Sequence, residues 1–116
     1  MNVEEVRNFC LSLKAVKEDF PFGEDTLVFK VAGKMFALAS LDSIPPQINL
    51  KCDPEKAIEL RESYNAVIPG YHMNKKHWNT VILDGSIKKT EIRTWVKDSY
   101  NLVVNSLKKS EKEKIK

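Results

Sequence analysis

The sequence predicts an α+β domain of two layers, in which helices cover one face of a five-stranded antiparallel sheet. Apolar residues recur with helical spacing in three segments. In five other segments they alternate with polar residues or cluster with β-branched residues. The segments follow one another in the order α-β-β-β-α-β-β-α. Helices on one face of an antiparallel sheet are the simplest architecture that this order allows.

The first predicted helix begins at Asn2. Asn2 and Glu5 have the spacing of a capping box, in which each side chain accepts a hydrogen bond from a free amide at the helix start. An apolar stripe follows at spacings of three and four: Val3, Val6, Cys10 and Leu13. Pro21 disfavours helical backbone at Phe20, so we expect the helix to end before that residue.

Three strands are predicted next. Residues 26–31 are rich in β-branched and aromatic side chains, and a turn at Gly33 and Lys34 joins them to a second strand over residues 35–39. Residues 47–52 alternate between apolar and polar side chains, which predicts a third strand with one face in water.

The second half of the chain predicts a helix, two strands and a helix. Asp53 and Pro54 are typical of a helix start, because aspartate can cap a helix and proline is tolerated at its first position. Residues 66–68 and 78–83 are expected to pair as strands. The spacing of apolar residues predicts a final helix over residues 90–107.

The length of the chain suits one hydrophobic core, so residues 1–107 are predicted to form a single domain. Residues 108–116 hold five lysines and two glutamates, and we expect them to form a charged, solvated C-terminal tail. This tail accounts for the whole net charge of +3, so the rest of the chain is neutral. Any basic patch on the domain must therefore be local.

The sequence predicts a cytoplasmic protein with reduced thiols. No apolar run approaches the ~20 residues that a membrane helix needs, and the acidic start differs from that of a signal peptide. Cys10 and Cys52 each lie within an apolar pattern, which favours two free cysteines.

Several short segments are specific in their joint order and spacing, although each is weak alone. They are Phe20-Pro21-Phe22-Gly23, Phe29-Lys30-Val31, Met35-Phe36-Ala37, Leu50-Lys51-Cys52, Pro54, Leu60-Arg61, Tyr64, Val67, the run from Pro69 to Asn79, Asp84-Gly85 and Ser99-Tyr100. Together they resemble the MmcQ/YjbR-like family over almost the whole chain. The resemblance implies a two-layer fold related to frataxin-like (CyaY-like) or secretion-chaperone-like domains. It implies no defined activity, but members are commonly labelled DNA-binding because two hairpins and a helix suggest a double wing.

The run from Tyr71 to Trp78 is the strongest candidate for a binding surface. Its lysines can neutralise phosphates, while Tyr71 and Trp78 could stack on exposed bases. The alternative is that Trp78 packs in the core and the lysines keep a turn soluble. The candidate nucleic-acid-binding residues are Lys34, Lys51, Lys75, Lys76 and His77. Four lysines on phosphates give a log-log salt slope of about −3 to −4, so we expect modest binding to DNA that salt screens easily.

A protein-interaction or small-ligand module is the second hypothesis. The neutral body and the resemblance to chaperone-like folds favour it, with an apolar groove bordered by Tyr71 and Trp78 as the site. Phe22, between Pro21 and Gly23, is a further candidate for a groove or a stacking contact. Its alternative is to pack over the junction between the first helix and the strands.

The sequence carries no recognised catalytic or metal-binding template. It has no G-x-S-x-G, P-loop, H-E-x-x-H or glycine fingerprint. His72 and His77 are five residues apart, which is not a metal-ligand spacing, and no cysteine or carboxylate clusters beside them. We therefore expect a non-enzymatic domain without a metal or another cofactor.

Overall fold

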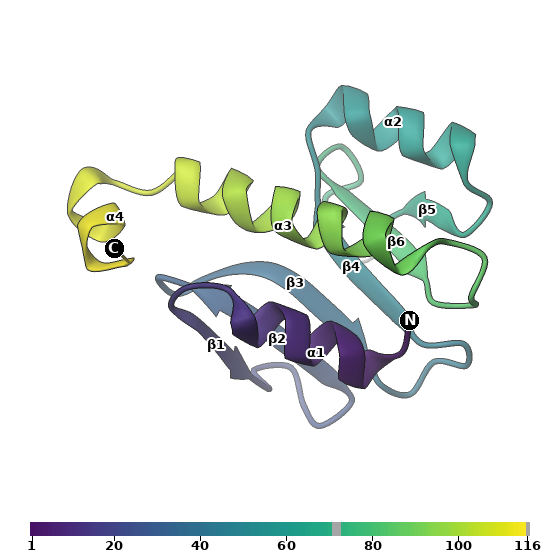
Figure 1. Cartoon of the computed structure of the whole chain (residues 1–116), viewed down its shortest axis with the longest axis horizontal. Coiled ribbons are helices and arrows are strands. Elements are labelled where there is room, and N and C mark those ends of the chain that lie inside the picture. The colour runs from purple at the N-terminus through teal and green to yellow at the C-terminus, as the bar shows by residue number, and fades with distance from the viewer. Residues whose placement is uncertain (71–72, 116) are drawn as a thin grey trace.

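The structure is a computed structural model that describes residues 1–70 and 73–115. This part of the chain forms four helices and six strands (Figure 1). In chain order they are α1 (Val3–Ser12), β1 (Val16–Asp19), β2 (Thr26–Val31), β3 (Lys34–Ser40), β4 (Gln47–Lys51), α2 (Pro54–Ser63), β5 (Val67–Pro69), β6 (Trp78–Ile82), α3 (Lys89–Asn105) and α4 (Lys109–Ile115).

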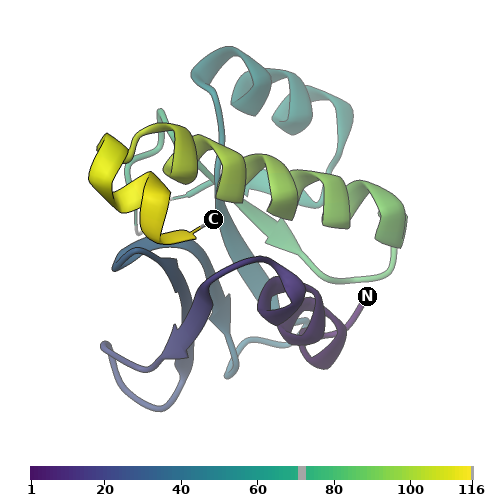
Figure 2. The ribbon, with the colours of Figure 1, turned by 60° about the vertical axis from the view of Figure 1, so that its left-hand side comes forward.

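The strands form one antiparallel sheet in the order β1-β2-β3-β4-β6-β5. Helices α1, α2 and α3 lie on the same face of this sheet (Figures 1 and 2), and their buried side chains share one core with it. The predicted α+β class with helices on one face of an antiparallel sheet is confirmed. The predicted number of five strands is wrong, because the described residues form six.

The additional strand is β1, which pairs with β2 at the edge of the sheet. It carries one apolar residue, Val16, so the alternating pattern that marks a half-buried strand is absent. Its Glu18 lies toward α1, where Arg7 donates two hydrogen bonds of 2.7 Å to the carboxylate. The ion pair between Arg7 and Glu18 therefore joins β1 to α1 where an apolar contact is usual.

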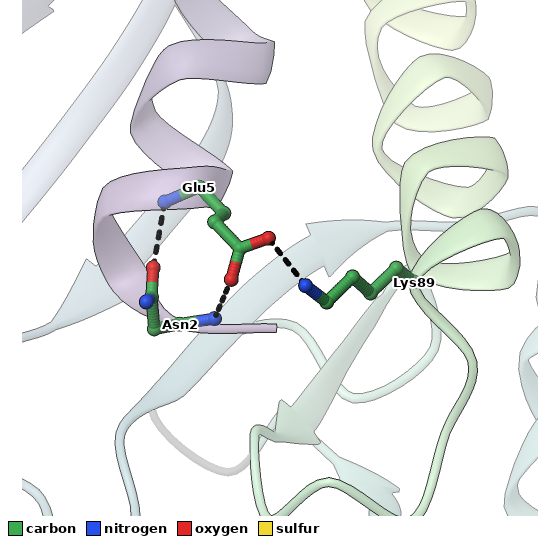
Figure 3. Close-up of polar contacts among 3 residues, drawn as sticks. All are labelled: Asn2, Glu5 and Lys89. Carbon is green, nitrogen blue, oxygen red and sulfur yellow. Dashed lines mark hydrogen bonds and ion pairs between the residues drawn. The ribbon is translucent and has the colours of Figure 1, made fainter.

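The capping box predicted at the start of α1 is confirmed. The Asn2 side chain accepts from the Glu5 amide at 2.8 Å, and the Glu5 carboxylate accepts from the Asn2 amide at 3.3 Å (Figure 3). The same carboxylate accepts from Lys89 Nζ at 2.8 Å. One side chain therefore caps α1 and links it to the first residue of α3.

The buried hydroxyl of Ser99 joins α3 to the centre of the sheet. Ser99 Oγ donates to the Phe36 carbonyl at 2.5 Å and accepts from the Lys51 amide at 2.9 Å. Phe36 lies at an irregularity in the β2–β3 register, where a backbone group would otherwise lack a partner. This contact fixes the last residue of β4 relative to α3.

The C-terminal segment differs from the solvated tail that we expected. Residues 109–115 form α4, whose Ile115 is buried in the main core. At its start the Glu111 carboxylate accepts from the Lys108 amide at 3.1 Å. A run of lysine and glutamate with a single apolar residue gives no amphipathic signal, so packing through Ile115 was not visible in the sequence.

Candidate nucleic-acid interface

Strand direction brings most of the candidate lysines to one end of the sheet. Because all neighbouring strands are antiparallel, the starts of β1, β3 and β6 lie at the same end as the last residues of β2, β4 and β5. We call it the basic end. Its lysines and histidine are Lys14, Lys17, Lys30, Lys34, Lys51, Lys75, Lys76 and His77.

The opposite end of the sheet has the opposite charge, and we call it the acidic end. It is formed by the loops of residues 20–25, 41–46 and 83–88, in which Lys88 is the one basic residue. They carry Glu24, Asp25, Asp42 and Asp84. The neutral net charge of the body therefore conceals a separation of charge along the strands.

Lys34 is exposed as the first residue of β3, directly after the β2–β3 turn. The turn itself consists of Ala32 and Gly33, whose φ angles are 51° and 76°. Two residues with positive φ are what a type I′ hairpin requires. The turn predicted at Gly33 and Lys34 is thus displaced by one residue, and Lys34 belongs to the strand.

Lys51 is the half-buried last residue of β4, opposite Trp78 in the register. The alternation along β4 buries Ile48 and Leu50 under the helices and places Lys51 on the other face. Lys51 thus extends the basic end onto the face of the sheet that the helices leave open.

The segment after β5 is held in place by backbone contacts that leave Lys76 exposed. The Asn74 carbonyl accepts from the amide of Trp78 at 2.9 Å, and its side chain accepts from the Lys76 amide at 2.9 Å. Arg61 on α2 donates to the carbonyl of Lys75, also exposed, at 3.0 Å. Tyr71 and His72 lie outside the described residues.

His77 is half-buried and connects this segment to the end of β4. Its carbonyl accepts from the Cys52 amide at 2.7 Å. The backbones that carry Lys51 and Lys76 are therefore tied together. The β2–β3 and β5–β6 hairpins each present lysine at this end.

Trp78 is only 8% exposed and belongs to a second, smaller core. It packs with Val28 and Leu38 on the sheet face away from the helices, where Met35 and Met73 cover it. Its ring is not presented for stacking on a base. The interpretation in which Trp78 packs in a core fits this geometry.

Phe22 is not brought together with Trp78. It lies in the loop of residues 20–25 at the acidic end and is 64% exposed. We considered that Phe22 could pack over the junction between the first helix and the strands, and its exposure contradicts that interpretation.

The basic end also includes lysines that the sequence patterns did not single out. Lys17 and Lys30 on β1 and β2 line a cavity of about 600 Å³ together with Lys114 of α4. Figure 1 shows α4 beside this end of the sheet. Lys30 is 3.5 Å from Asp19, which compensates part of its charge. These lysines can be placed at the basic end only from the direction of their strands, and that requires β1 to be recognised as a strand.

Glu18, an acidic residue that lines the same cavity, is paired with Arg7. The Arg7 guanidinium hydrogen-bonds Glu18 and lowers the pKa of that carboxyl, and the Glu18 carboxylate raises the pKa of Arg7. Both groups therefore remain charged and paired, so Glu18 does little to offset the exposed lysines.

Two further observations concern the described residues only. No helix among them is long and apolar enough to cross a membrane. Within residues 1–70 and 73–115, no three His, Cys, Asp or Glu side chains gather closely enough to hold a metal ion. Cys10 and Cys52 are free.

The family model YjbR matches residues 11–102. The chain belongs to the YjbR family. It is 40% identical over 113 residues to the protein YbdF of Escherichia coli O157:H7, covering 97% of this chain and 93% of that protein. It is 33% identical over 107 residues to YjbR of Escherichia coli K12, covering 92% and 91%. Both relatives are called uncharacterized proteins, so membership of the YjbR family establishes ancestry and fold and assigns no activity.

Two solved structures that are similar to this chain agree with the fold. The crystal structure of the Deinococcus radiodurans protein DR2400 superimposes with a TM-score of 0.92 at 38% identity, covering 98% of this chain and 87% of that one. A crystal structure from Pseudomonas syringae gives a TM-score of 0.77 at 30% identity, covering 88% and 98%. The resemblance inferred from the sequence motifs is thereby confirmed.

Proposed function

We propose that this YjbR-family chain is a non-enzymatic domain that binds DNA through the phosphate groups that meet its basic end. The observation that carries the proposal is the separation of charge along the strands. Lysines from four separate segments meet at one end of the sheet, and the loops at the other end carry four acidic residues and a single lysine, Lys88. A local positive surface attracts a polyanion even when the body as a whole is neutral.

The side chains at the basic end favour contacts with phosphate over contacts with base edges. Lysine is a point charge on a flexible stem, which suits phosphate but reads little sequence. Arginine is the usual reader of guanine, but Arg7 is paired with Glu18 and Arg61 donates to backbone carbonyls. We therefore propose binding without strong sequence preference and with marked sensitivity to salt.

Backbone conformation at the basic end also supports the proposal. Among the described residues, Ala15 and Ala32 are the non-glycine residues with positive φ, at 63° and 51°. Both lie in turns at the basic end. Strained backbone of this kind costs free energy and is enriched at functional sites. At the acidic end the positive φ angles belong to Gly23 and Gly85, which adopt them without a Cβ penalty.

The proposal is tested by reversing charge at the basic end. Fluorescence anisotropy of labelled duplex and single-stranded DNA at low salt compares the wild type with Lys75→Glu/Lys76→Glu. The variant should lose affinity by about ten-fold or more, since two attractive contacts become repulsive. Equal affinities would contradict the proposal.

The matched control makes the same change in net charge elsewhere. Lys88 and Lys97 are exposed on the N-terminal side and the middle of α3, away from the basic end. Lys88→Glu/Lys97→Glu should reduce affinity by no more than the general effect of net charge. If it weakens binding as much as Lys75→Glu/Lys76→Glu, the interaction depends on net charge and has no defined interface.

A second variant separates the sheet from α4. Deleting residues 109–115 would remove the buried Ile115, so Lys109→Gln/Lys112→Gln is the better change. The proposal expects a smaller loss from this pair than from the pair in the β5–β6 segment. A loss confined to the α4 variant would move the contact from the sheet to the C-terminal helix and contradict the proposal.

A further inference from the structure

A groove lies between α2 and α3 in the helix layer. Its volume is about 310 Å³, and Leu60, Tyr64 and Trp95 line it with apolar surface. The rings of Tyr64 and Trp95 meet edge to face with centroids 5.1 Å apart. The Tyr64 hydroxyl donates to the Glu91 carboxylate at 2.5 Å, which holds that carboxylate at the rim.

A small chamber lies beside the groove, above the sheet. The chamber has a volume of about 20 Å³, enough for one water-sized group, and it shares Leu60 and Trp95 with the outer groove. Leu50 and Val81 form its apolar floor. The groove and the chamber are therefore neighbours, with Leu60 and Trp95 contributing to the walls of both.

Asn79 of β6 lines the inner chamber and is 2% exposed. Its Nδ2 donates to the Ala57 carbonyl at 3.2 Å, which fixes the amide because a carbonyl can only accept. Its Oδ1 is buried without a hydrogen-bond partner among the described residues. An acceptor in this position is unfavourable unless a donor comes to it.

The groups around this acceptor favour a positively charged donor. Asp98 lines the chamber, and Glu59 and Glu91 line the outer groove. Lys56 lines both the chamber and the groove, and Glu59, 3.8 Å away, offsets part of its charge. The indole of Trp95 offers a ring to a cation.

Two other polar residues of the chamber, Cys52 and Lys51, bring no positively charged donor to Asn79 Oδ1. Burial raises the pKa of the half-buried Cys52 thiol, and the nearby charges of Asp53 and Asp98 raise it further, so the thiol is neutral. Lys51 also lines the chamber, but the alternation along β4 directs its side chain to the other face of the sheet.

We propose that this groove binds a short primary alkylamine. Its ammonium group occupies the inner chamber, donates to Asn79 Oδ1, and is balanced by the carboxylate of Asp98. Its alkyl chain lies in the outer groove against Leu60 and Trp95. This site is in the helix layer and is independent of the DNA-binding proposal for the basic end.

The test is a titration followed by the indole N–H signals of the two tryptophans in two-dimensional NMR. The probes are pentylamine, pentanol and pentanoate, which share an alkyl chain and differ in the head group. Pentylamine should shift the Trp95 signal to saturation and leave Trp78, on the opposite face, unchanged. Pentanol and pentanoate should bind about ten-fold more weakly or worse, since they lack a charge-assisted donor.

Two variants test the acceptor and the charge separately. Asn79→Leu removes the acceptor and leaves the Ala57 carbonyl with its helical contacts, and pentylamine affinity should fall by about ten-fold or more. Asp98 is exposed, and Asp98→Asn preserves the shape of the side chain, so this variant should fold even if Asn79→Leu does not. It should also weaken the binding of pentylamine. Glu55→Gln, an exposed charge on α2 that does not line the groove, should leave the affinity unchanged.

Three outcomes would overturn the proposal. A Trp95 signal that pentylamine leaves unchanged shows that the groove holds only solvent. Equal binding of pentanol and pentylamine shows an apolar groove without an amine site. Unchanged pentylamine affinity in both Asn79→Leu and Asp98→Asn shows that the amine binds elsewhere.

Discussion

The two ends of the antiparallel sheet are built from the same strands but differ in charge and in backbone conformation. The basic end carries exposed lysines in the β2–β3 and β5–β6 hairpins, and its turns hold Ala15 and Ala32 at positive φ. The acidic end carries aspartate and glutamate, its positive φ angles belong to glycine, and it exposes apolar side chains such as Phe22 and Ile44.

This difference teaches that strand direction, and not nearness in sequence, assembles a charged surface. Lys34, Lys51 and Lys76 are separated by long stretches of chain, yet antiparallel pairing brings their strand ends together. The net charge of zero outside the C-terminal segment does not reveal this charged surface. The predictions that follow test how far the two ends differ, beginning with the largest expected effect.

The largest effect is expected at Gly70, where β5 leads into the basic end. A Cβ added there would lie 3.0 Å from both the Cβ and the carbonyl oxygen of Trp78. Gly70→Ala should therefore lower the free energy of unfolding by about 1–3 kcal/mol, measured by urea denaturation. It should also shift the indole N–H signal of Trp78.

The control for this prediction is Gly85→Ala at the acidic end. A Cβ at Gly85 meets nothing within 4 Å, so the only cost is the positive φ of 86°. This variant should leave the Trp78 signal unchanged. If Gly70→Ala is as stable as the wild type, the backbone at Gly70 does not approach β6 as closely as the structure indicates.

A smaller effect of opposite sign is expected at Ala32. Its φ of 51° lies in the left-handed region, which asparagine tolerates better than alanine, and Asn-Gly is a preferred type I′ pair. Ala32→Asn should raise the free energy of unfolding by about 0.5–1 kcal/mol. DNA affinity should not change, because the substitution is neutral in charge. A loss of stability would show that the turn has another geometry.

The smallest effect is expected from the ion pair between Arg7 and Glu18. The pair lowers the pKa of Glu18, so its contribution to stability is present at neutral pH and is lost as pH falls through the folded pKa. Glu18→Gln should cost about 0.5 kcal/mol or less at low salt. The cost should vanish in acid and in concentrated NaCl.

Asp84 at the acidic end provides the contrast. Hydrogen bonds from the Ser86 side chain and backbone lower its pKa, so this contribution is also lost in acid. These are short-range contacts with neutral donors, so the thermal shift of Asp84→Ala should depend little on salt. A similar salt dependence for Glu18→Gln and Asp84→Ala would contradict the assignment of the first to an ion pair.

The sequence predicted the parts of the fold that bury an apolar pattern. The cap at Asn2, the strand with Ile48 and Leu50, and the helix that includes Val96 all carry the periodicity of their structure. It missed β1 and α4, because each carries a single apolar residue, the half-buried Val16 and the buried Ile115, and is otherwise polar or charged. Elements of this kind are stabilised by pairing and by ion pairs, which leave no periodic signal.

The candidate surfaces were only partly visible in the sequence. The lysines of the β5–β6 segment stood out because they are adjacent in the chain. Phe22 and Trp78, which were separate candidates for a groove or a stacking contact, lie at opposite ends of the sheet because β6 starts at the end where β2 finishes. The groove between α2 and α3 was not found, since Leu60, Asn79 and Trp95 come from three elements and meet only in the folded chain.

The central claim is that DNA contacts one end of the sheet. Amide signals of the ¹⁵N-labelled protein, followed by NMR during addition of a DNA duplex at low salt, test it most directly. The account predicts shifts at Lys34, Lys51 and Lys76 and at their neighbours, which salt reverses, and none in the loops of residues 20–25, 41–46 and 83–88. Shifts at the acidic end, or no shifts at either end, would contradict it.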